Sequence, residues 1–251
     1  MPSLPFPETP LREALLQGIY DAHAAWQQNS RWACCAGCSA CCTQSVTVTG
    51  LEAGLILRYL DAPGGISAKA IESFSRESAQ IQASEQTTNH RARLCLNGIE
   101  PPEPEETPWD FTPCPFLQDD HCSIYPVRPM MCRAFVSAGD CREHGSAEIP
   151  QHVLTGNTVF LQIVEHVAQG EVWGNLLDIL HAKICEAHEG PQRGRLAISE
   201  AIPGLLVPEE EYALLEGLFA SLRRIQVRDK SLMQWLEQMM KENHDDHAAK
   251  Q

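Results

Sequence analysis

The sequence has no uninterrupted apolar run long enough to cross a membrane, which needs roughly 20 residues in a helix. Its first residues, Met1 to Glu8, contain neither a basic stretch nor an apolar segment, and a secretory signal requires both. We therefore expect a cytoplasmic protein with no membrane partner.

Basic residues are also scarce. The chain has 19 Lys and Arg against 33 Asp and Glu, a formal net charge of −14. A nucleic-acid surface needs a concentration of Lys and Arg, because phosphate contacts supply most of the affinity. This balance excludes a broad nucleic-acid surface and indicates a well-solvated exterior.

Common catalytic signatures are missing as well. The sequence has no glycine-rich phosphate loop, no nucleophile elbow and no HExxH helix. It also has no internal repeat at solenoid spacing. With 251 residues, 43% of them hydrophobic, the chain can bury a core as one large or two small domains. No specific reaction follows from these patterns.

Cysteine, in contrast, is abundant. The chain has eleven, and ten of them lie between Cys34 and Cys141. Five fall within residues 34–42, Cys-Cys-Ala-Gly-Cys-Ser-Ala-Cys-Cys, a loop with too little apolar bulk to pack by itself. A disulfide scaffold is the alternative, but in a reducing compartment clustered cysteines indicate metal ligation.

A second cysteine block follows. Residues 114–117 (Cys-Pro-Phe-Leu) and 122–125 (Cys-Ser-Ile-Tyr) predict a β-hairpin whose turn is formed by residues 118–121. Residues 128–133 are Arg-Pro-Met-Met-Cys-Arg, which predicts a helix with Cys132 in its first turn. The helix N-terminus and the two arginines are expected to stabilise a thiolate there.

The number of thiols matches the needs of metal sites. Four thiolates close a structural zinc site, so eight fill two tetrahedral shells. Eight could equally hold an iron–sulfur cluster and leave sulfurs for a second ion. Because adjacent side chains diverge, Cys41 and Cys42 are easier to place on two neighbouring metals, or as one ligand and one auxiliary thiol. The predicted metal ligands are Cys35, Cys38, Cys41, Cys42, Cys114, Cys122, Cys132 and Cys141.

These motifs, in this order, resemble the CxxCxxCC (YkgJ-like) family of zinc- or iron-chelating proteins. The resemblance runs from about Trp32 to Glu143 and includes the step from Val48 through Thr49 to Glu52. It implies metal chelation without naming a reaction, and no motif fixes Cys141. The family cysteines that it implies are Cys35, Cys38, Cys41, Cys42, Cys114, Cys122 and Cys132.

The leading hypothesis is a protein that chelates Zn2+ or an Fe ion through clustered thiolates, with the metal ion as its partner. One alternative is an iron–sulfur enzyme related to flagellin lysine-N-methylases, in which the same module occurs. The other is a protein-interaction module that zinc folds. Whether the protein is an enzyme stays open.

Other candidate ligands are weaker. Cys34 and Cys95 have no partner motif, so we expect free or buried thiols. His181, Cys185 and His188 share one helix face at a spacing compatible with ligation. That face adjoins apolar residues, which favours an ordinary half-buried helix.

The expected fold is mainly α: a helical protein with a small β-hairpin and a cysteine-rich metal-binding loop region. We expect an N-terminal arm and helix over 1–29, a cysteine-cluster module over 30–145, and a C-terminal helical region over 150–251 packed on it.

Within that plan, helices are predicted over 10–29, 50–60 and 67–93, and a strand over 45–48. Thr49 and Glu52 predict a capping box at the start of the second helix. A Pro/Glu-rich loop is expected over 100–108. From about 151 onward the pattern is helical, with one helix beginning near Trp173 and another at Pro208.

Overall fold

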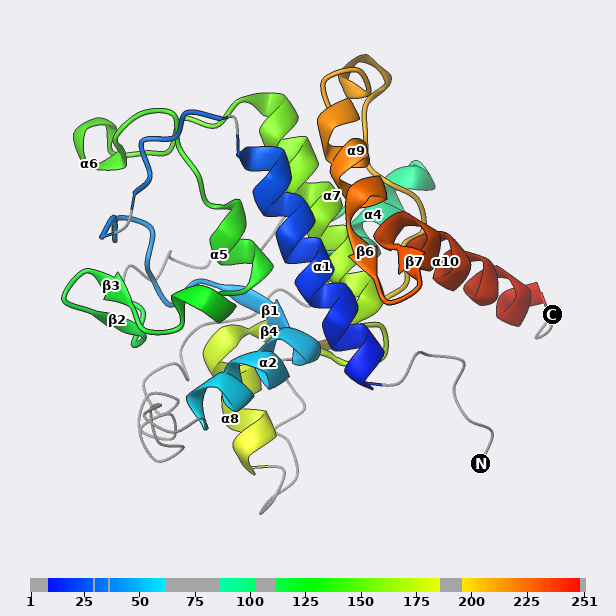
Figure 1. Cartoon of the computed structure of the whole chain (residues 1–251), viewed down its shortest axis with the longest axis horizontal. Helices are drawn as coiled ribbons and strands as arrows, with labels where there is room; N and C mark the ends of the chain where they lie inside the picture. The colour runs from blue at the N-terminus through cyan, green and yellow to red at the C-terminus, as the bar shows by residue number, and fades with distance from the viewer. Residues whose placement is uncertain are drawn as a thin grey trace.

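The computed structural model describes residues 9–28, 30–35, 37–61, 86–102, 112–185 and 196–248, without the side chains of 185 and 242–248. The described chain is mainly α-helical with a few short antiparallel strands, as the sequence predicted (Figure 1). Its helices are α1 (Thr9–Gln27), α2 (Gly50–Leu60), α4 (Thr88–Leu96), α5 (Met130–Ala134), α6 (Cys141–His144), α7 (Gln151–Val167), α8 (Leu176–Cys185), α9 (Glu216–Arg224) and α10 (Leu232–Ala248), with 3-10 turns at Tyr125–Val127 and Glu209–Glu211.

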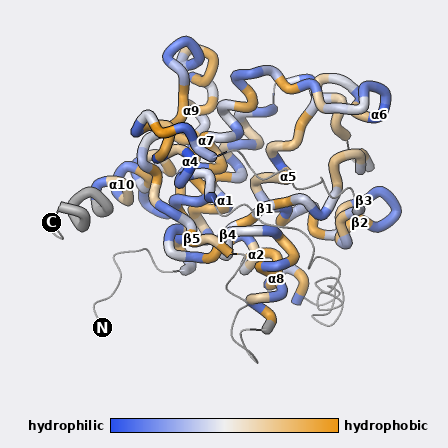
Figure 2. The backbone as a smooth tube through the Cα atoms, turned by 180° about the vertical axis from the view of Figure 1, so that it is seen from behind, coloured by the Kyte–Doolittle hydropathy of each residue, from blue (hydrophilic) through white to orange (hydrophobic). Residues whose placement is uncertain are grey.

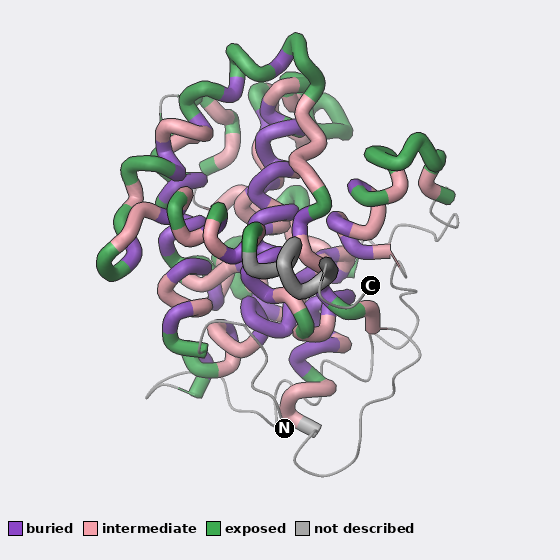
Figure 3. Tube along the Cα trace, turned by 90° about the vertical axis from the view of Figure 1, so that its right-hand side faces the viewer, coloured by how far each residue is buried: buried purple, intermediate pink, exposed green. Residues whose placement is uncertain are grey.

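The first core lies where α1 packs against α7 and α9. The helix predicted over 10–29 forms α1, and its Leu15 and Ile19 are fully buried. Figure 3 shows the buried stretches gathered along these central helices. Near the end of α1, the rings of His23 and Trp26 pack against Phe160 of α7.

The second core lies between α2, α8 and a three-stranded antiparallel sheet. The sheet has the order β1-β4-β5, with β1 (Thr47–Thr49), β4 (Val172–Asn175) and β5 (Ala197–Ile198). The buried residues of this core are Val46, Val48, Ala53, Ile56, Leu60, Phe116, Ile124, Leu176, Leu177, Ile179 and Leu180. Since these come from both halves of the chain, the cysteine-rich part and the helical part share one core; the domain boundaries stay a prediction.

The capping box before α2 is confirmed. Thr49 Oγ1 accepts a hydrogen bond from the Glu52 backbone N–H at 3.2 Å, and Glu52 Oε2 accepts one from the Thr49 N–H at 2.9 Å. The helix has the predicted bounds. The preceding strand spans 47–49 instead of 45–48, because its register is set by pairing with β4.

The all-helical prediction beyond 151 is wrong in detail. Trp173 lies in β4, opposite Thr49, and not in a helix. The helix begins after Asn175, whose Oδ1 accepts a hydrogen bond from the Leu177 N–H at 2.9 Å. A Gly-Asn pair in a β-rich stretch thus ends a strand and caps the next helix.

The region after 200 also differs from the prediction. Pro208 precedes only a 3-10 turn, and α9 begins after Leu215. A short hairpin, β6 (Gln226–Val227) and β7 (Lys230–Ser231), separates α9 from α10. None of the helices in the described ranges is both long enough and apolar enough to cross a membrane.

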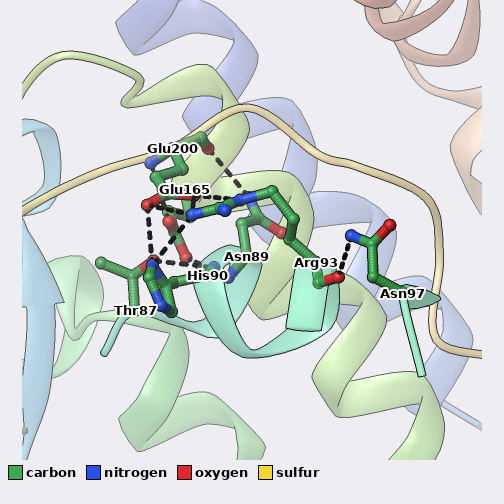
Figure 4. A network of polar contacts seen from close by, with 7 residues as sticks. All are labelled: Thr87, Asn89, His90, Arg93, Asn97, Glu165 and Glu200. Carbon is green, nitrogen blue, oxygen red and sulfur yellow. Dashed lines mark hydrogen bonds and ion pairs between the residues drawn. The ribbon is translucent and has the colours of Figure 1, made fainter. Parts of the chain in front are cut away.

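Helix α4 is attached to α7 by a polar network (Figure 4). The buried Glu165 accepts hydrogen bonds from the backbone N–H groups of Asn89 and Glu200, each at 2.8 Å. Burial raises the pKa of Glu165, although these bonds act in the opposite direction. Arg93 pairs with Glu200 at 3.0 Å.

Parts of two predictions lie outside the described residues: most of the helix expected over 67–93 and most of the Pro/Glu-rich loop expected over 100–108. The described end of the first is α4, which runs to Leu96 and so contains Cys95.

Candidate metal centre

The cysteine loop is held at both ends by backbone hydrogen bonds. On one side, the Ala33 N–H donates to the Ser137 carbonyl at 2.8 Å. On the other, the Cys114 N–H donates to the Cys42 carbonyl at 2.9 Å, next to a bridge between Thr43 and Pro113. The loop therefore spans from the segment before α6 to the segment before the hairpin, as its trace in Figure 1 shows.

Two tight turns shape the loop between these ends. The Cys38 N–H donates to the Cys35 carbonyl and the Cys42 N–H to the Ser39 carbonyl, both at 3.0 Å. Gly37 has φ +84°, a conformation that strains any residue with a Cβ.

The hairpin is tighter than predicted, with strands β2 (Leu117–Gln118) and β3 (His121–Cys122). Asp119 and Asp120 have φ of 48° and 62°, the left-handed pair of a two-residue hairpin turn. Asp120 Oδ1 accepts a hydrogen bond from Ser39 Oγ at 2.7 Å, so the turn touches the cysteine loop. Figure 2 shows the hydrophilic tip of this hairpin.

A buried carboxylate fixes the start of α5. Glu52 Oε1 accepts the Met130 N–H at 2.7 Å and the Tyr20 hydroxyl at 3.1 Å. Its Oε2 accepts from the backbone N–H and the hydroxyl of Thr49. Burial raises the pKa of Glu52, against the opposite effect of these four hydrogen bonds. Residues of α1, of the segment before α2 and of α5 are therefore all hydrogen-bonded to the Glu52 carboxylate, close in sequence to Cys132.

The other end of α5 is held by a second buried pair. Asn157 Nδ2 donates to the Ala134 carbonyl at 3.0 Å, and Asn157 Oδ1 lies 3.1 Å from His23 Nε2. The short helix that carries Cys132 is thus fixed at both ends by side chains from other helices.

The thiolate predicted at Cys132 is not favoured by its surroundings. The side chain sits in the first turn of α5, as expected, and Arg128 lowers its pKa. Burial has the larger effect and raises that pKa, and nearby thiols add to the rise. A five-residue helix has a weak dipole, so desolvation dominates.

Four of the predicted ligands form what we call the inner group: Cys42, Cys114, Cys122 and Cys132. The sulfur of Cys42 interacts electrostatically with those of the other three, and Cys132 with Cys114 and Cys122 and also with Cys41. All but Cys42 pack against the second core. Burial raises the pKa of Cys114 to about 11 and also raises that of Cys122.

A different set surrounds Cys34, which interacts electrostatically with Cys38, Cys41 and Cys141. We call these four the outer group. The two groups adjoin, because the Cys41 thiol hydrogen-bonds to the Cys42 sulfur. That bond lowers the pKa of Cys42 and raises the pKa of Cys41.

The remaining candidates lie elsewhere. Cys35 is exposed. Cys95 is exposed on α4, and His181 is exposed on α8. The side chain of Cys185 and the whole of His188 lie outside the described part of the chain.

The described cysteines are all free thiols, and sulfur is a donor that both zinc and iron accept. Over the described ranges, no three Cys, His, Asp or Glu side chains are gathered closely enough to hold one metal ion. The fit therefore rests on the donor chemistry: three thiols pack against the second core and interact electrostatically with Cys42, and a bound cation would stabilise their thiolates.

The sequence comparison agrees with this chemistry. Residues 34–152 match the sequence model of the CxxCxxCC family, described as a "Putative zinc- or iron-chelating domain". The chain therefore carries a domain of this family, and the resemblance seen in the motifs is confirmed. The match covers somewhat less than half of the chain. It ends at the start of α7 and does not include the helices that follow α7. Neither curated proteins nor solved structures gave a match.

Proposed function

We propose that this protein chelates one Zn2+ or Fe ion through the thiolates of the inner group. The observation that carries the proposal is that Cys114, Cys122 and Cys132 pack against the second core and that all three interact electrostatically with Cys42 of the cysteine loop. Four thiolates complete the tetrahedral shell of a structural zinc site. The remaining predicted ligands, Cys35, Cys38, Cys41 and Cys141, stay predictions under this proposal.

The electrostatics support a cation at this place. Burial raises the pKa of three inner thiols, so these groups are protonated near neutral pH when no cation is bound. A bound dication stabilises the thiolate form of these groups, so their protons are released when it binds. The Arg128 guanidinium also interacts with Cys122 and Cys132, and lies 4.0 Å above the ring of Tyr125.

The inner group favours a structural role for the ion. Its members belong to the cysteine loop, to the hairpin and to α5, which are short segments separated in the sequence. A metal bound to all four would join these segments and contribute directly to folding. We propose that the protein works in the cytoplasm, where reducing conditions keep thiols available.

Anaerobic purification followed by elemental analysis tests this function. The wild-type protein should contain at least one stoichiometric Zn or Fe, and C122S should lose it. C95S serves as the matched control, because Cys95 is exposed on α4, and it should keep the metal. A wild-type protein without stoichiometric metal overturns the proposal. A brown protein with charge-transfer absorption would identify an iron–sulfur cluster, and a colourless one zinc.

A further inference from the structure

Residues 200–206, which we call the strap, lie along α7 and are held there by side chains that bind the backbone of the strap. Gln162 of α7 makes two of these bonds. Its Nε2 donates to the Gly204 carbonyl at 2.9 Å, and its Oε1 accepts the Leu206 N–H at 3.1 Å. The strap is thus bound through its peptide groups, as an extended peptide is bound by a protein.

Glu165 of α7 holds the strap and α4 with the same carboxylate (Figure 4). Its Oε1 accepts the Glu200 N–H of the strap, and its Oε2 accepts the Asn89 N–H of α4, each at 2.8 Å. The Asn89 side chain in turn donates to the carbonyls of Gln162 and Glu200, both at 3.0 Å. Because one buried network joins the three segments, neither α4 nor the strap can leave α7 without breaking bonds of the other.

An outer set of ion pairs links the strap to α4 at the surface. The Glu200 carboxylate lies 3.0 Å from the Arg93 guanidinium and 3.0 Å from His90 Nδ1. These side chains are between a third and a half exposed, and ion pairs at such positions stabilise little. The buried carboxylate of Glu165 is therefore the main connection.

Apolar burial contributes little to the attachment of either segment. Of the described residues 86–97 and 200–206, the buried apolar side chains are Ala92 and Ile202, and Leu205 is partly buried. Segments with few buried apolar contacts open locally at a lower free energy than the whole protein unfolds. The polar network thus sets how often α4 and the strap open.

The attached state also carries a penalty. The Ile202 N–H donates to His166 Nδ1 at 3.3 Å, so the proton of the neutral imidazole is on Nε2. In the described part of the chain, this buried Nε2 has no hydrogen-bond partner, and neither has the buried hydroxyl of Ser199, which directly precedes the strap. Opening would let water satisfy both groups, which favours the open state.

We propose that α4 and the strap open from α7 together, as one unit anchored by Glu165, while α1 and α7 stay packed on each other. Helix α4 lies within the family domain at 34–152, and the strap lies outside it. The unit is therefore a releasable joint between the domain and the C-terminal part of the chain. This inference goes beyond metal chelation and does not depend on it.

Native-state hydrogen exchange of the full-length protein, measured by mass spectrometry in a series of low urea concentrations, tests the joint. We expect 88–97 and 200–206 to share one opening equilibrium in the wild type. Its urea dependence should be smaller than that of the amides around Phe160 in α7, because local opening exposes less surface than global unfolding.

The variant E165Q tests the anchor. Its amide nitrogen replaces one acceptor oxygen and leaves a buried N–H without a partner, so both segments should exchange roughly 5- to 150-fold faster. E200Q is the matched control in the same network. It removes the outer ion pairs and keeps the backbone bonds of Glu200, so it should accelerate exchange by less than about five-fold.

Each other outcome contradicts a defined part of the proposal. If 88–97 and 200–206 exchange with the urea dependence of α7, they do not open locally. If their opening equilibria differ, or if E165Q accelerates only one of them, they are not one unit. Equal effects of E165Q and E200Q would show that Glu165 is not the anchor. Should E165Q fail to fold, the urea series on the wild type still decides whether the unit opens.

Discussion

Glu52 Oε1 accepts the backbone N–H of Met130 at 2.7 Å, which links the capping box of α2 to the first turn of α5. The same carboxylate binds Tyr20 of α1. Because Cys132 lies two residues beyond Met130, the position of an inner thiol depends on a carboxylate that is itself no metal ligand.

Replacing Glu52 with Gln tests this linkage. The amide nitrogen of E52Q takes the place of one acceptor oxygen, so two of the four donors lose their partner. Leaving buried donors unpaired costs about 1–3 kcal/mol of unfolding free energy. We expect a lower urea midpoint for the zinc-loaded protein and weaker zinc binding.

E13Q is the control for this variant. Glu13 also joins α1 to α2, through Arg58 at 2.8 Å, but the pair is partly exposed and contributes only about 0–1 kcal/mol. Equal urea midpoints for E52Q and E13Q would contradict the role assigned to Glu52.

A pair of glycine substitutions tests the packing of α1 on α7. A Cβ at Gly156 would lie 2.3 Å from the Trp26 ring, so G156A should destabilise the protein by about 1–3 kcal/mol. At Gly54, in α2, the nearest atom would be 3.7 Å away, and G54A should stabilise by about 0.5–1 kcal/mol. Thermal unfolding measures both, and the idea fails if the two variants shift the midpoint in the same direction.

Buried histidines predict a pH dependence of stability. Burial lowers the pKa of His23 and of His166 to about 4, from an ordinary value of 6.5. Between these values the unfolded chain binds more protons, so each histidine's contribution is complete above pH 6.5 and is lost as the pH falls toward 4. H23Q should reduce the slope of unfolding free energy against pH by up to about 1.4 kcal/mol per pH unit near pH 5.

H23Q has to be compared with the wild type, because other groups also make the stability depend on pH. Burial raises the pKa of Glu52 and Glu165, and their contribution to the slope of unfolding free energy against pH has the opposite sign. H166Q should change the slope as H23Q does. Chemical denaturation from pH 4 to 7 gives the slopes, and parallel curves for wild type and H23Q would show that the His23 pKa is not lowered.

Metal removal should loosen only one side of the molecule. We expect a chelator to raise amide exchange over 37–46, 112–124 and 130–134, which depend on the inner group. Helix α7 is buried in the first core at Phe160 and Ile163, so its exchange should change little. Hydrogen-exchange mass spectrometry measures this, and uniform deprotection would show that the ion holds the whole fold.

Local signals predicted much of the fold. The pair Thr49 and Glu52 predicts the start of α2 from four neighbouring residues. Trp173 was misplaced because a short strand depends on its partner, here Thr49, far away in sequence. The contact between Glu52 and Met130 has no sequence signal, since the capping box already explains the glutamate.

The sequence likewise predicts only part of the arrangement of the thiols. The spacing and number of the cysteines predict that they gather in space. That the boundary between the outer and the inner group falls between Cys41 and Cys42 depends on the path of the loop from Ser137 to Pro113. The pKa of Cys132 depends on burial, which the flanking arginines do not reveal.

The pairing of Thr49 with Trp173 has a consequence during synthesis. The cysteine loop leaves the ribosome well before β4 exists, and at about 5–20 residues per second the delay is on the order of 6–25 seconds. During that interval the thiols of the nascent chain have no second core to pack against. An ion captured then would hold the loop, hairpin and α5 together before translation supplies the strand that completes the sheet.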